Sequence, residues 1–153
     1  MNVFMRGTPF KFVYFDLPQK ELTPLFLKDQ IKLTAMKTFR DLIVWQKAME
    51  LVTLIYQLSK SFPKDELYGL ISQMRRTAVS IPANIAEGYG RRSTQDYLRF
   101  LQIAMSSNFE LQTLLEIARN LHYLSTDSFE NAFDKSREIE RMLSSLIKKV
   151  SSK

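Results

Sequence analysis

The sequence contains no cysteine and only one histidine, His122. The absence of cysteine excludes a disulfide framework and a thiolate metal site, and a single histidine cannot build a histidine-rich metal centre within one subunit. We therefore expect no metal and no cofactor. A chain without disulfides is also typical of the reducing cytoplasm, which is the location we predict.

Long apolar stretches are absent as well. The longest uncharged runs have about ten residues, whereas a membrane-spanning helix needs about 20, and the N-terminus has no uninterrupted apolar segment of the kind found in signal peptides. The four glycines form no phosphate-binding loop, and no nucleophile and base stand in a recognisable pattern. Glu87 and Glu110 are the one carboxylate pair worth considering, but the Glu-x-x-His motif of bundle-core metal sites is missing. We predict that the protein is not an enzyme.

The composition that is present favours one globular domain with an anionic partner. The chain has 153 residues, of which 45% are hydrophobic, enough for a single well-formed core. Lysine and arginine number 22 against 16 acidic residues, so the net charge is +6. A basic balance of this kind favours partners such as nucleic acids.

The first 35 residues differ from the remainder. A short aromatic run, Phe10 to Phe15, lies between Pro9 and Pro18, and no helical period follows it. We predict an N-terminal extension over residues 1–35 and a helical domain over residues 36–153. The extension is either an edge strand or docked tail, or the product of an upstream start choice, with Met36 as the natural start.

From Asp41 onward, apolar residues recur every three or four positions in four successive segments, which predicts four helices joined by short loops. Ser93 to Asp96 resemble a capping box at the start of the third helix, and the fourth is expected to begin near Thr126. The second helix is expected to stop near Gly88 and Gly90, where glycine can adopt the left-handed cap conformation. The fold class is therefore all-α, an antiparallel up-down-up-down four-helix bundle. The predicted stripes are Trp45, Ala48, Val52 and Ile55; Leu67, Ile71, Met74, Ala78, Ile81 and Ile85; Tyr97, Leu101, Ala104, Asn108, Leu111, Leu115, Ala118 and His122; and Phe129, Ala132, Ile139, Leu143, Leu146 and Val150.

The second helix carries an interior proline beside a polar row whose members recur every three or four residues: Gln73, Arg76, Ser80, Asn84 and Glu87. Pro82 removes one helix hydrogen bond, at a cost of about 3 kcal/mol or more, and so needs compensation. The row is either a solvated face or a helix–helix or subunit interface, in which Ser80 or Asn84 compensates for the proline and Glu87 or Glu110 pairs with Arg75 or Arg76. Trp45 is interpreted as a core or interface anchor. The candidate interface residues are Gln73, Ser80, Pro82, Asn84, Glu87, Glu110 and Trp45.

Arginines concentrate around the connection between the second and third helices. Between residues 75 and 99, five arginines stand against Glu87 and Asp96, so this segment carries +3 of the net charge. Guanidinium groups bind phosphates bidentately, although arginines in loops also serve simply to keep a surface soluble. Tyr89 and Tyr97 flank the cluster and could stack on bases, but Tyr97 fits the core stripe better. The candidate nucleic-acid contacts are Arg75, Arg76, Arg91, Arg92 and Arg99.

Several of these motifs together resemble one family. Phe39-Arg40-Asp41-Leu42, Gln73-Met74-Arg75-Arg76 and Ser80-Ile81-Pro82-Ala83-Asn84-Ile85-Ala86-Glu87-Gly88 are similar to segments of the bacterial four-helix-bundle proteins encoded in intervening sequences of 23S ribosomal RNA genes. The resemblance covers roughly residues 38–148. Met105 is a departure, since relatives often have a small or flexible residue there.

The resemblance implies a homopentamer with a suspected nucleic-acid role. A related bundle, the accessory variability determinant of diversity-generating retroelements, is a basic partner of a reverse transcriptase and its RNA. Two functions therefore stay open for this chain. It is either an adaptor for ribosomal or other structured RNA, or a protein–protein scaffold that serves, for example, a reverse transcriptase.

Overall fold

The computed structural model describes residues 38–152, which belong to one compact unit, Lys37–Lys153. Its α-helices are α2 (Ile43–Leu58), α3 (Leu70–Tyr89), α4 (Thr94–Asn120) and α5 (Thr126–Ser151). The 3₁₀ turns η1 (Phe39–Asp41), η2 (Ser59–Ser61) and η3 (Lys64–Leu67) complete the described elements, and no strand occurs among residues 38–152. The predicted all-α four-helix fold is confirmed. The predicted extension, residues 1–35, lies outside the described residues, and the division at residue 36 stays a prediction.

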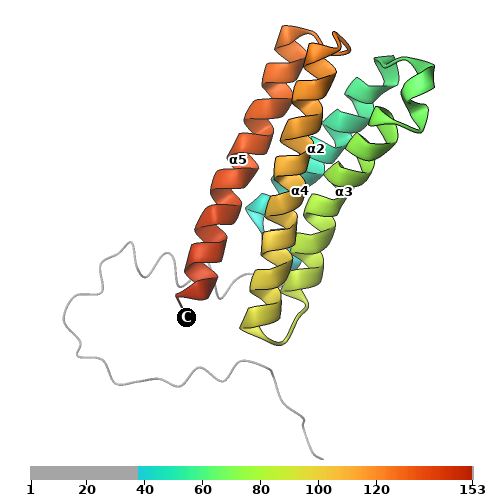
Figure 1. The fold of residues 1–153 in the computed structure, drawn as a ribbon. Helices are drawn as coiled ribbons and strands as arrows, with labels where there is room; N and C mark the ends of the chain where they lie inside the picture. The colour runs from blue at the N-terminus through green and yellow to red at the C-terminus, as the bar shows by residue number, and fades with distance from the viewer. Residues whose placement is uncertain (1–37, 153) are drawn as a thin grey trace, which may run out of the picture. The chain divides into compact units, whose positions relative to one another are not determined.

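The four helices run alternately up and down, so each packs against two neighbours (Figure 1). α4 lies between α3 and α5, and α2 closes the ring by contacting the same two helices. Residues 90–93, which connect α3 to α4, lie at the same end of the bundle as the C-terminus of α5 (Figure 1); we call this the Gly90 end. The opposite end, which we call the Phe62 end, holds residues 59–69 and 121–125.

The helix stripes bury their apolar side chains in one shared core. Two helices begin after a serine N-cap. The Ser93 side chain accepts a hydrogen bond from the Asp96 N–H at the start of α4, and the Ser125 side chain accepts one from the Ser128 N–H at the start of α5. These caps confirm the predicted starts of the third and fourth helices. In α2 the buried stripe is Val44, Ala48, Leu51 and Ile55, so its centre is shifted slightly from the prediction. The large side chains with almost no exposure are Leu51, Ile55, Met74, Ile81, Ile85, Leu101, Leu111, Leu115, Ile139 and Leu143.

Two residues assigned to the core stripes lie outside the core. Leu67 is in η3, three residues before α3 begins, and its side chain is 48% exposed. His122 follows the end of α4 with φ of 57°, in the left-handed region. The His122 N–H donates to the Arg119 carbonyl and the Tyr123 N–H to the Ala118 carbonyl, which is a Schellman cap. From the sequence, His122 is either a packing or a capping residue. It occupies a capping position and does not pack on the core, because the helix ends before it.

α3 ends at Tyr89, which confirms the predicted stop near Gly88 and Gly90, but neither glycine has the left-handed conformation. Gly90 has φ of −77° and ψ of −6°, an ordinary right-handed conformation, so no left-handed cap ends α3. Gly88 is inside the helix and buried, and a Cβ at this position would lie only 2.7 Å from the Cβ of Phe100 and 3.0 Å from a ring carbon of Tyr97. Glycine is needed at position 88 because α4 approaches the α3 backbone so closely.

Candidate nucleic-acid interface and polar row

Arg91 is bound to its own neighbourhood at the Gly90 end. Its guanidinium makes an ion pair with Glu87, one helical turn earlier, and lies 4.5 Å from the centre of the Phe100 ring. Both side chains of the ion pair are exposed, 43% for Arg91 and 54% for Glu87. An exposed pair of this type contributes only about 0.3–0.5 kcal/mol. The Arg91 guanidinium therefore remains accessible to an anionic partner, but its contacts with Glu87 and Phe100 fix its position.

Arg92 and Arg99 are exposed and form no ion pair with any carboxylate of residues 38–152. Arg92 follows Arg91 in the connection, and Arg99 lies in the second turn of α4. The antiparallel topology brings further cations to this end, because α2 begins there and α5 ends there (Figure 1). These are Arg40 in η1 and Lys148 and Lys149 in the last turn of α5.

The sequence-based selection missed these three cations because it considered only one hairpin. The signal that would have found them is the predicted up-down-up-down order, which places the first helix start, the second connection and the last helix end together. With them, the Gly90 end holds six cations, Arg40, Arg91, Arg92, Arg99, Lys148 and Lys149, against the acids Asp41, Glu87 and Asp96.

Arg75 and Arg76 lie away from the Gly90 end. Arg75 is about 21 Å along α3 from the end of the helix, at 1.5 Å per residue, and faces α2. Its Nε donates to the Ser59 hydroxyl at 2.9 Å, and its guanidinium lies 4.9 Å from the centre of the Tyr56 ring. Arg76 is exposed and donates to the Gln73 side-chain oxygen. The five arginines thus do not form one continuous cluster.

The polar row follows the seam between α3 and α4. Gln73 donates from Nε2 to a Glu110 oxygen, and the Ser80 and Ser107 hydroxyls lie 2.9 Å apart across the seam. Asn84 Nδ2 donates to the Ser80 carbonyl at 2.7 Å and contacts its hydroxyl at 3.0 Å. Part of the row therefore forms a helix–helix contact within the chain.

The expected pairing partners differ from those in the structure. Glu87 pairs with Arg91, and Glu110 accepts from Gln73, which in turn accepts from Arg76, so neither acid pairs directly with Arg75 or Arg76. Asn84 bonds the Ser80 carbonyl, whereas Pro82 removes the donor of the Ala78 carbonyl. Buried Pro82 instead gains apolar packing on the core side of α3. Trp45 is half-buried and packs edge-on against Phe39, with ring centres 5.2 Å apart.

The two glutamates considered as a catalytic pair are held far apart. Glu110 accepts a hydrogen bond from Gln73 and so lies beside this residue of α3. Glu87 is 14 residues after Gln73 on α3, a distance of about 21 Å along the helix axis. Such a separation is too large for two carboxylates to act on one bond. Among residues 38–152, no three His, Cys, Asp or Glu side chains gather in a group suited to a metal ion.

Tyr97 belongs to the seam and is half-buried. Its ring lies against Gly88, and burial, with a smaller contribution from Tyr89, raises the pKa of Tyr97 to about 12. The hydroxyl therefore keeps its proton at any physiological pH. This packing supports the core assignment of Tyr97 over a base-stacking role.

Asn108 is the one fully buried amide of α4. Its Nδ2 donates to the Ser136 carbonyl of α5 at 3.0 Å, while its Oδ1 has no hydrogen-bond partner within the described part of the chain. A polar group buried in this way restricts the register of two helices, because sliding them would remove its hydrogen bond.

The comparisons with known proteins agree with this architecture. The model of the family described as 23S rRNA-intervening sequence protein matches residues 40–145. The chain belongs to the 23S rRNA-intervening sequence protein family. A solved structure of a protein of unknown function from the S23 ribosomal protein family of Bacteroides thetaiotaomicron is 29% identical, with a TM-score of 0.65. The match covers 69% of this chain and 96% of that one. No curated protein matches the chain.

Membership in the 23S rRNA-intervening sequence protein family identifies no enzymatic activity. Within residues 38–152, none of the helices is both long and apolar enough to cross a membrane. The family match includes α2, α3, α4 and most of α5. The polar row and the arginines of the Gly90 end are inside the matched region, whereas Lys148 and Lys149 lie beyond it.

Proposed function

We propose that this family member is a non-enzymatic, cytoplasmic homopentamer that binds structured RNA through the Gly90 end. The observation that carries the proposal is the group of exposed cations there, in which Arg92 and Arg99 have no carboxylate partner among the described residues. A guanidinium group that has no ion-pair partner binds a phosphate without first breaking an ion pair. A ring of subunits would repeat this surface and raise the affinity through avidity.

The test is a fluorescence-anisotropy titration of the full chain with 23S ribosomal RNA fragments, and with duplex DNA as a comparison, over about 50–200 mM salt. Neutralisation of several phosphates should weaken binding by about 10³-fold over this range. Arg92→Ala combined with Arg99→Ala should reduce the salt slope by about two. Lys60→Ala combined with Lys64→Ala is the matched control, because it removes the same charge from the Phe62 end.

Equal losses in the two double variants would show that only net charge matters and would refute the assignment of a surface. Salt-insensitive capture of a protein, with no RNA binding at micromolar concentrations, would instead favour the scaffold function, for example as a subunit that accompanies a reverse transcriptase.

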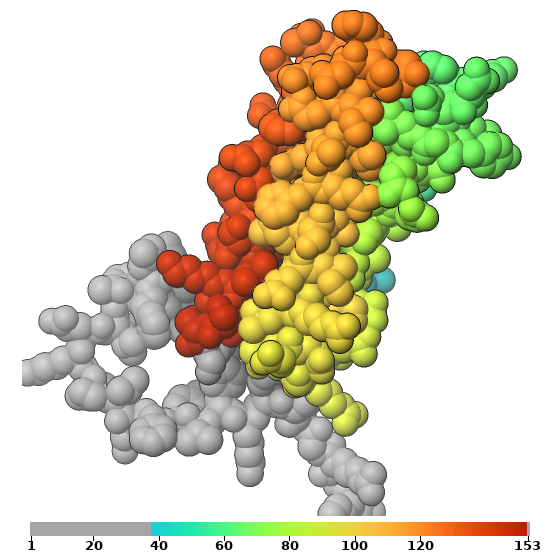
Figure 2. Space-filling view, in the orientation of Figure 1, coloured from blue at the N-terminus to red at the C-terminus, as the bar shows by residue number. Residues whose placement is uncertain are grey.

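Self-association is supported by apolar side chains exposed on α3 and α4. Val79 is 42% exposed, Ile103 38%, Phe109 47% and Ile117 41%. α4 dominates one face of the bundle, between α3 and α5 (Figure 2). Burial of such side chains between subunits would remove apolar area from water, at about 25 cal/mol per Å².

The oligomeric state can be measured by sedimentation equilibrium. Ile103→Asp should lower the mass from a pentamer towards a monomer, because a charge would enter the subunit contact. Met49→Asp on α2 is the control, since Met49 is 41% exposed but on a different helix. Glu87→Ala tests whether the polar row also extends into the interface. Unchanged mass in both Ile103→Asp and Glu87→Ala would place the contact elsewhere or exclude the pentamer.

A further inference from the structure

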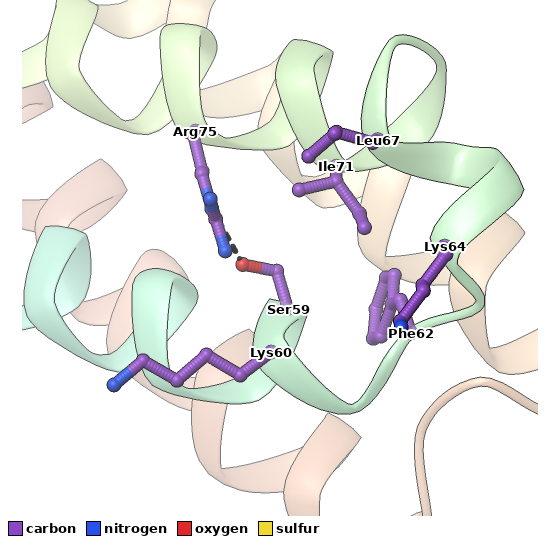
Figure 3. Close-up of a pocket in the computed structure, with 7 residues that line it drawn as sticks. All are labelled: Ser59, Lys60, Phe62, Lys64, Leu67, Ile71 and Arg75. Atoms are coloured by element: carbon purple, nitrogen blue, oxygen red, sulfur yellow. Dashed lines mark hydrogen bonds between the residues drawn. The ribbon is translucent and has the colours of Figure 1, made fainter.

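A cavity of about 410 Å³ opens at the Phe62 end between the first turns of α3 and the segment that follows α2, which contains η2 and η3. This volume is within the range of about 300–1,000 Å³ found for small-molecule sites. Its apolar wall consists of Phe62, Leu67 and Ile71 (Figure 3). Leu67 is 48% exposed on η3. Its side chain therefore presents apolar surface to the cavity, where the apolar part of a ligand can contact it.

The charged side chains that line the cavity are all cations: Lys60, Lys64 and Arg75. None of them makes an ion pair with a carboxylate of residues 38–152. The nearest acids in the sequence are Asp65 and Glu66, and neither lines the cavity. Both Glu66 oxygens are already in use, one by the Leu70 N–H at 3.0 Å and the other by the Tyr123 hydroxyl at 3.3 Å.

Arg75 is held in place before any ligand arrives. Figure 3 shows its side chain reaching from α3 to Ser59, whose oxygen accepts from Arg75 Nε at 2.9 Å. Ser59 is only 1% exposed, and its own hydroxyl donates to the Tyr56 carbonyl at 3.3 Å. The Tyr56 ring lies under the guanidinium at 4.9 Å. A guanidinium has five N–H donors, and the intramolecular contact uses only the one on Nε.

An apolar wall beside cations that have no carboxylate partner is suited to a ligand that is both anionic and apolar. A half-buried guanidinium without a counter-ion loses hydration and gains no ion pair, so an anion that binds it restores the missing interaction. Arg75 is the anchor because it is fixed. Lys64 lies beside Phe62, whereas Lys60 extends along α2 away from Phe62 (Figure 3). Both lysines add positive potential at the rim.

We propose that this cavity binds a small molecule in which a carboxylate or phosphate monoester is joined to a compact apolar group. The terminal N–H groups of Arg75 bind the anionic oxygens, and the apolar group lies against Leu67, Ile71 and Phe62. This site is separate from the cations of the Gly90 end, so it stands whether or not the protein binds RNA.

Isothermal titration calorimetry of the full chain tests the proposal with four probes: phenyl phosphate, 3-phenylpropionate, inorganic phosphate and 2-phenylethanol. At least one aryl anion should bind with a Kd of about 1 mM or lower. Inorganic phosphate lacks the apolar group and 2-phenylethanol lacks the charge, so each should bind at least about tenfold more weakly. The tighter of the two aryl anions identifies whether the site prefers a phosphate or a carboxylate.

Arg75→Met should reduce the affinity for the aryl anion by about tenfold or more, because a charge-assisted hydrogen bond is lost. Arg76→Met is the matched control, since Arg76 is the next residue on α3 but does not line the cavity, and it should leave the Kd within about twofold. Far-UV circular dichroism establishes that both variants fold. If Arg75→Met does not fold, Lys64→Met provides the same comparison on the exposed rim.

Chemical-shift mapping on the labelled protein locates the probe. The amides of Ser59, Leu67 and Ile71 should shift, and those of residues 90–99 should not. No binding of either aryl anion at about 10 mM, inorganic phosphate as tight as phenyl phosphate, or an equal loss in Arg75→Met and Arg76→Met would each overturn the proposal.

Discussion

The two seams that α3 forms with its neighbours differ in how closely they are packed. Towards α4, the backbone at Gly88 leaves no room for a Cβ, and hydroxyl and amide groups bond across the contact. On the side of α2, the first turns of α3 and the segment from η2 to η3 leave a cavity at the Phe62 end with an exposed leucine on its wall. The same helix therefore has one side on which an added methyl group at Gly88 would overlap its neighbour, and another side with a cavity large enough for a small ligand.

The two seams also differ in the partners of their arginines. Arg75 and Arg91 each lie over an aromatic ring, at 4.9 Å from Tyr56 and 4.5 Å from Phe100. Arg91 also has Glu87 as an ion-pair partner, whereas Arg75 donates to the hydroxyl of Ser59 and pairs with no carboxylate of residues 38–152. A count of arginines in the sequence cannot distinguish an arginine that has an ion-pair partner from one that has none.

The largest effect is expected at the open seam from Ile71→Ala. Ile71 is 5% exposed at the base of the cavity, and its truncation should lower the unfolding free energy by about 2–5 kcal/mol through lost burial and an enlarged void. Leu67→Ala removes a similar volume from the exposed wall and should change stability by no more than about 0.5 kcal/mol. Urea denaturation measures both. Equal losses would mean that Leu67 is part of the core after all.

At the closed seam, Gly88→Ala should destabilise the protein by about 1–3 kcal/mol, because the new methyl group overlaps the Phe100 Cβ and the helices must separate. Gly90→Ala is the internal control. Gly90 has an ordinary negative φ, and a Cβ there would make ordinary contacts with the Glu87 and Ala86 carbonyl oxygens, at 3.5 and 4.0 Å. This second change should stabilise by about 0.4–1 kcal/mol. Thermal melts of the two variants that move in the same direction would contradict the contrast.

A smaller effect is expected from the hydroxyl pair of the closed seam. Ser80→Ala and Ser107→Ala each remove one side of a part-buried hydrogen bond, and the double-mutant cycle should give a coupling of about 0.5–1.5 kcal/mol. Ser106→Ala on the exposed side of α4 is the control and should show no coupling to Ser80→Ala. Zero coupling between residues 80 and 107 would indicate that water replaces the contact at no cost.

A further effect is confined to alkaline pH. The folded-state pKa of Tyr97 is raised to about 12 by burial, so the unfolded chain releases this proton first. Stability from the neutral Tyr97 is fully present below about pH 10 and is lost as pH rises from about 10 to about 12. The melting temperature should fall across this range, and Tyr97→Phe should make the fall shallower. A Tyr97→Phe curve that is parallel to the wild-type curve would exclude Tyr97 as the cause.

Periodicity alone was sufficient to predict four helices, because each buried stripe repeats at the helical period and two starts have serine caps. It could not place Leu67 or His122, because each continues the period of a neighbouring helix although Leu67 precedes the start of α3 and His122 follows the end of α4. Both helix ends depend on backbone hydrogen bonds that spacing does not reveal. Gly88 illustrates the same limit, because a glycine near a helix end suggests a cap and only the approach of α4 shows that it is a packing position.

The candidate site was harder to predict than the fold. Helical phase turns Arg75 towards α2 and Arg76 towards solvent, although they are adjacent in the sequence. The cations that α2 and α5 bring to the Gly90 end are more than 50 residues away from Arg91 in the chain, so a local charge count could not include them. Arg75 belongs to a motif that identifies the family, but the sequence does not show that Arg75 lines a cavity with Phe62, Leu67 and Ile71.

The absence of a side chain at Gly88 has a consequence for the order of folding. A four-residue connection joins α3 to α4, so this helical hairpin closes with a small loss of chain entropy, whereas the contact of Glu50 with Lys135 joins residues 85 positions apart. Formation of the hairpin before α2 and α5 dock requires that the two backbones meet at Gly88 early. Gly88→Ala is then expected to slow refolding in stopped-flow measurements more than it accelerates unfolding. A single hydrogen atom in place of a methyl group would thus help to set the folding rate of the whole bundle.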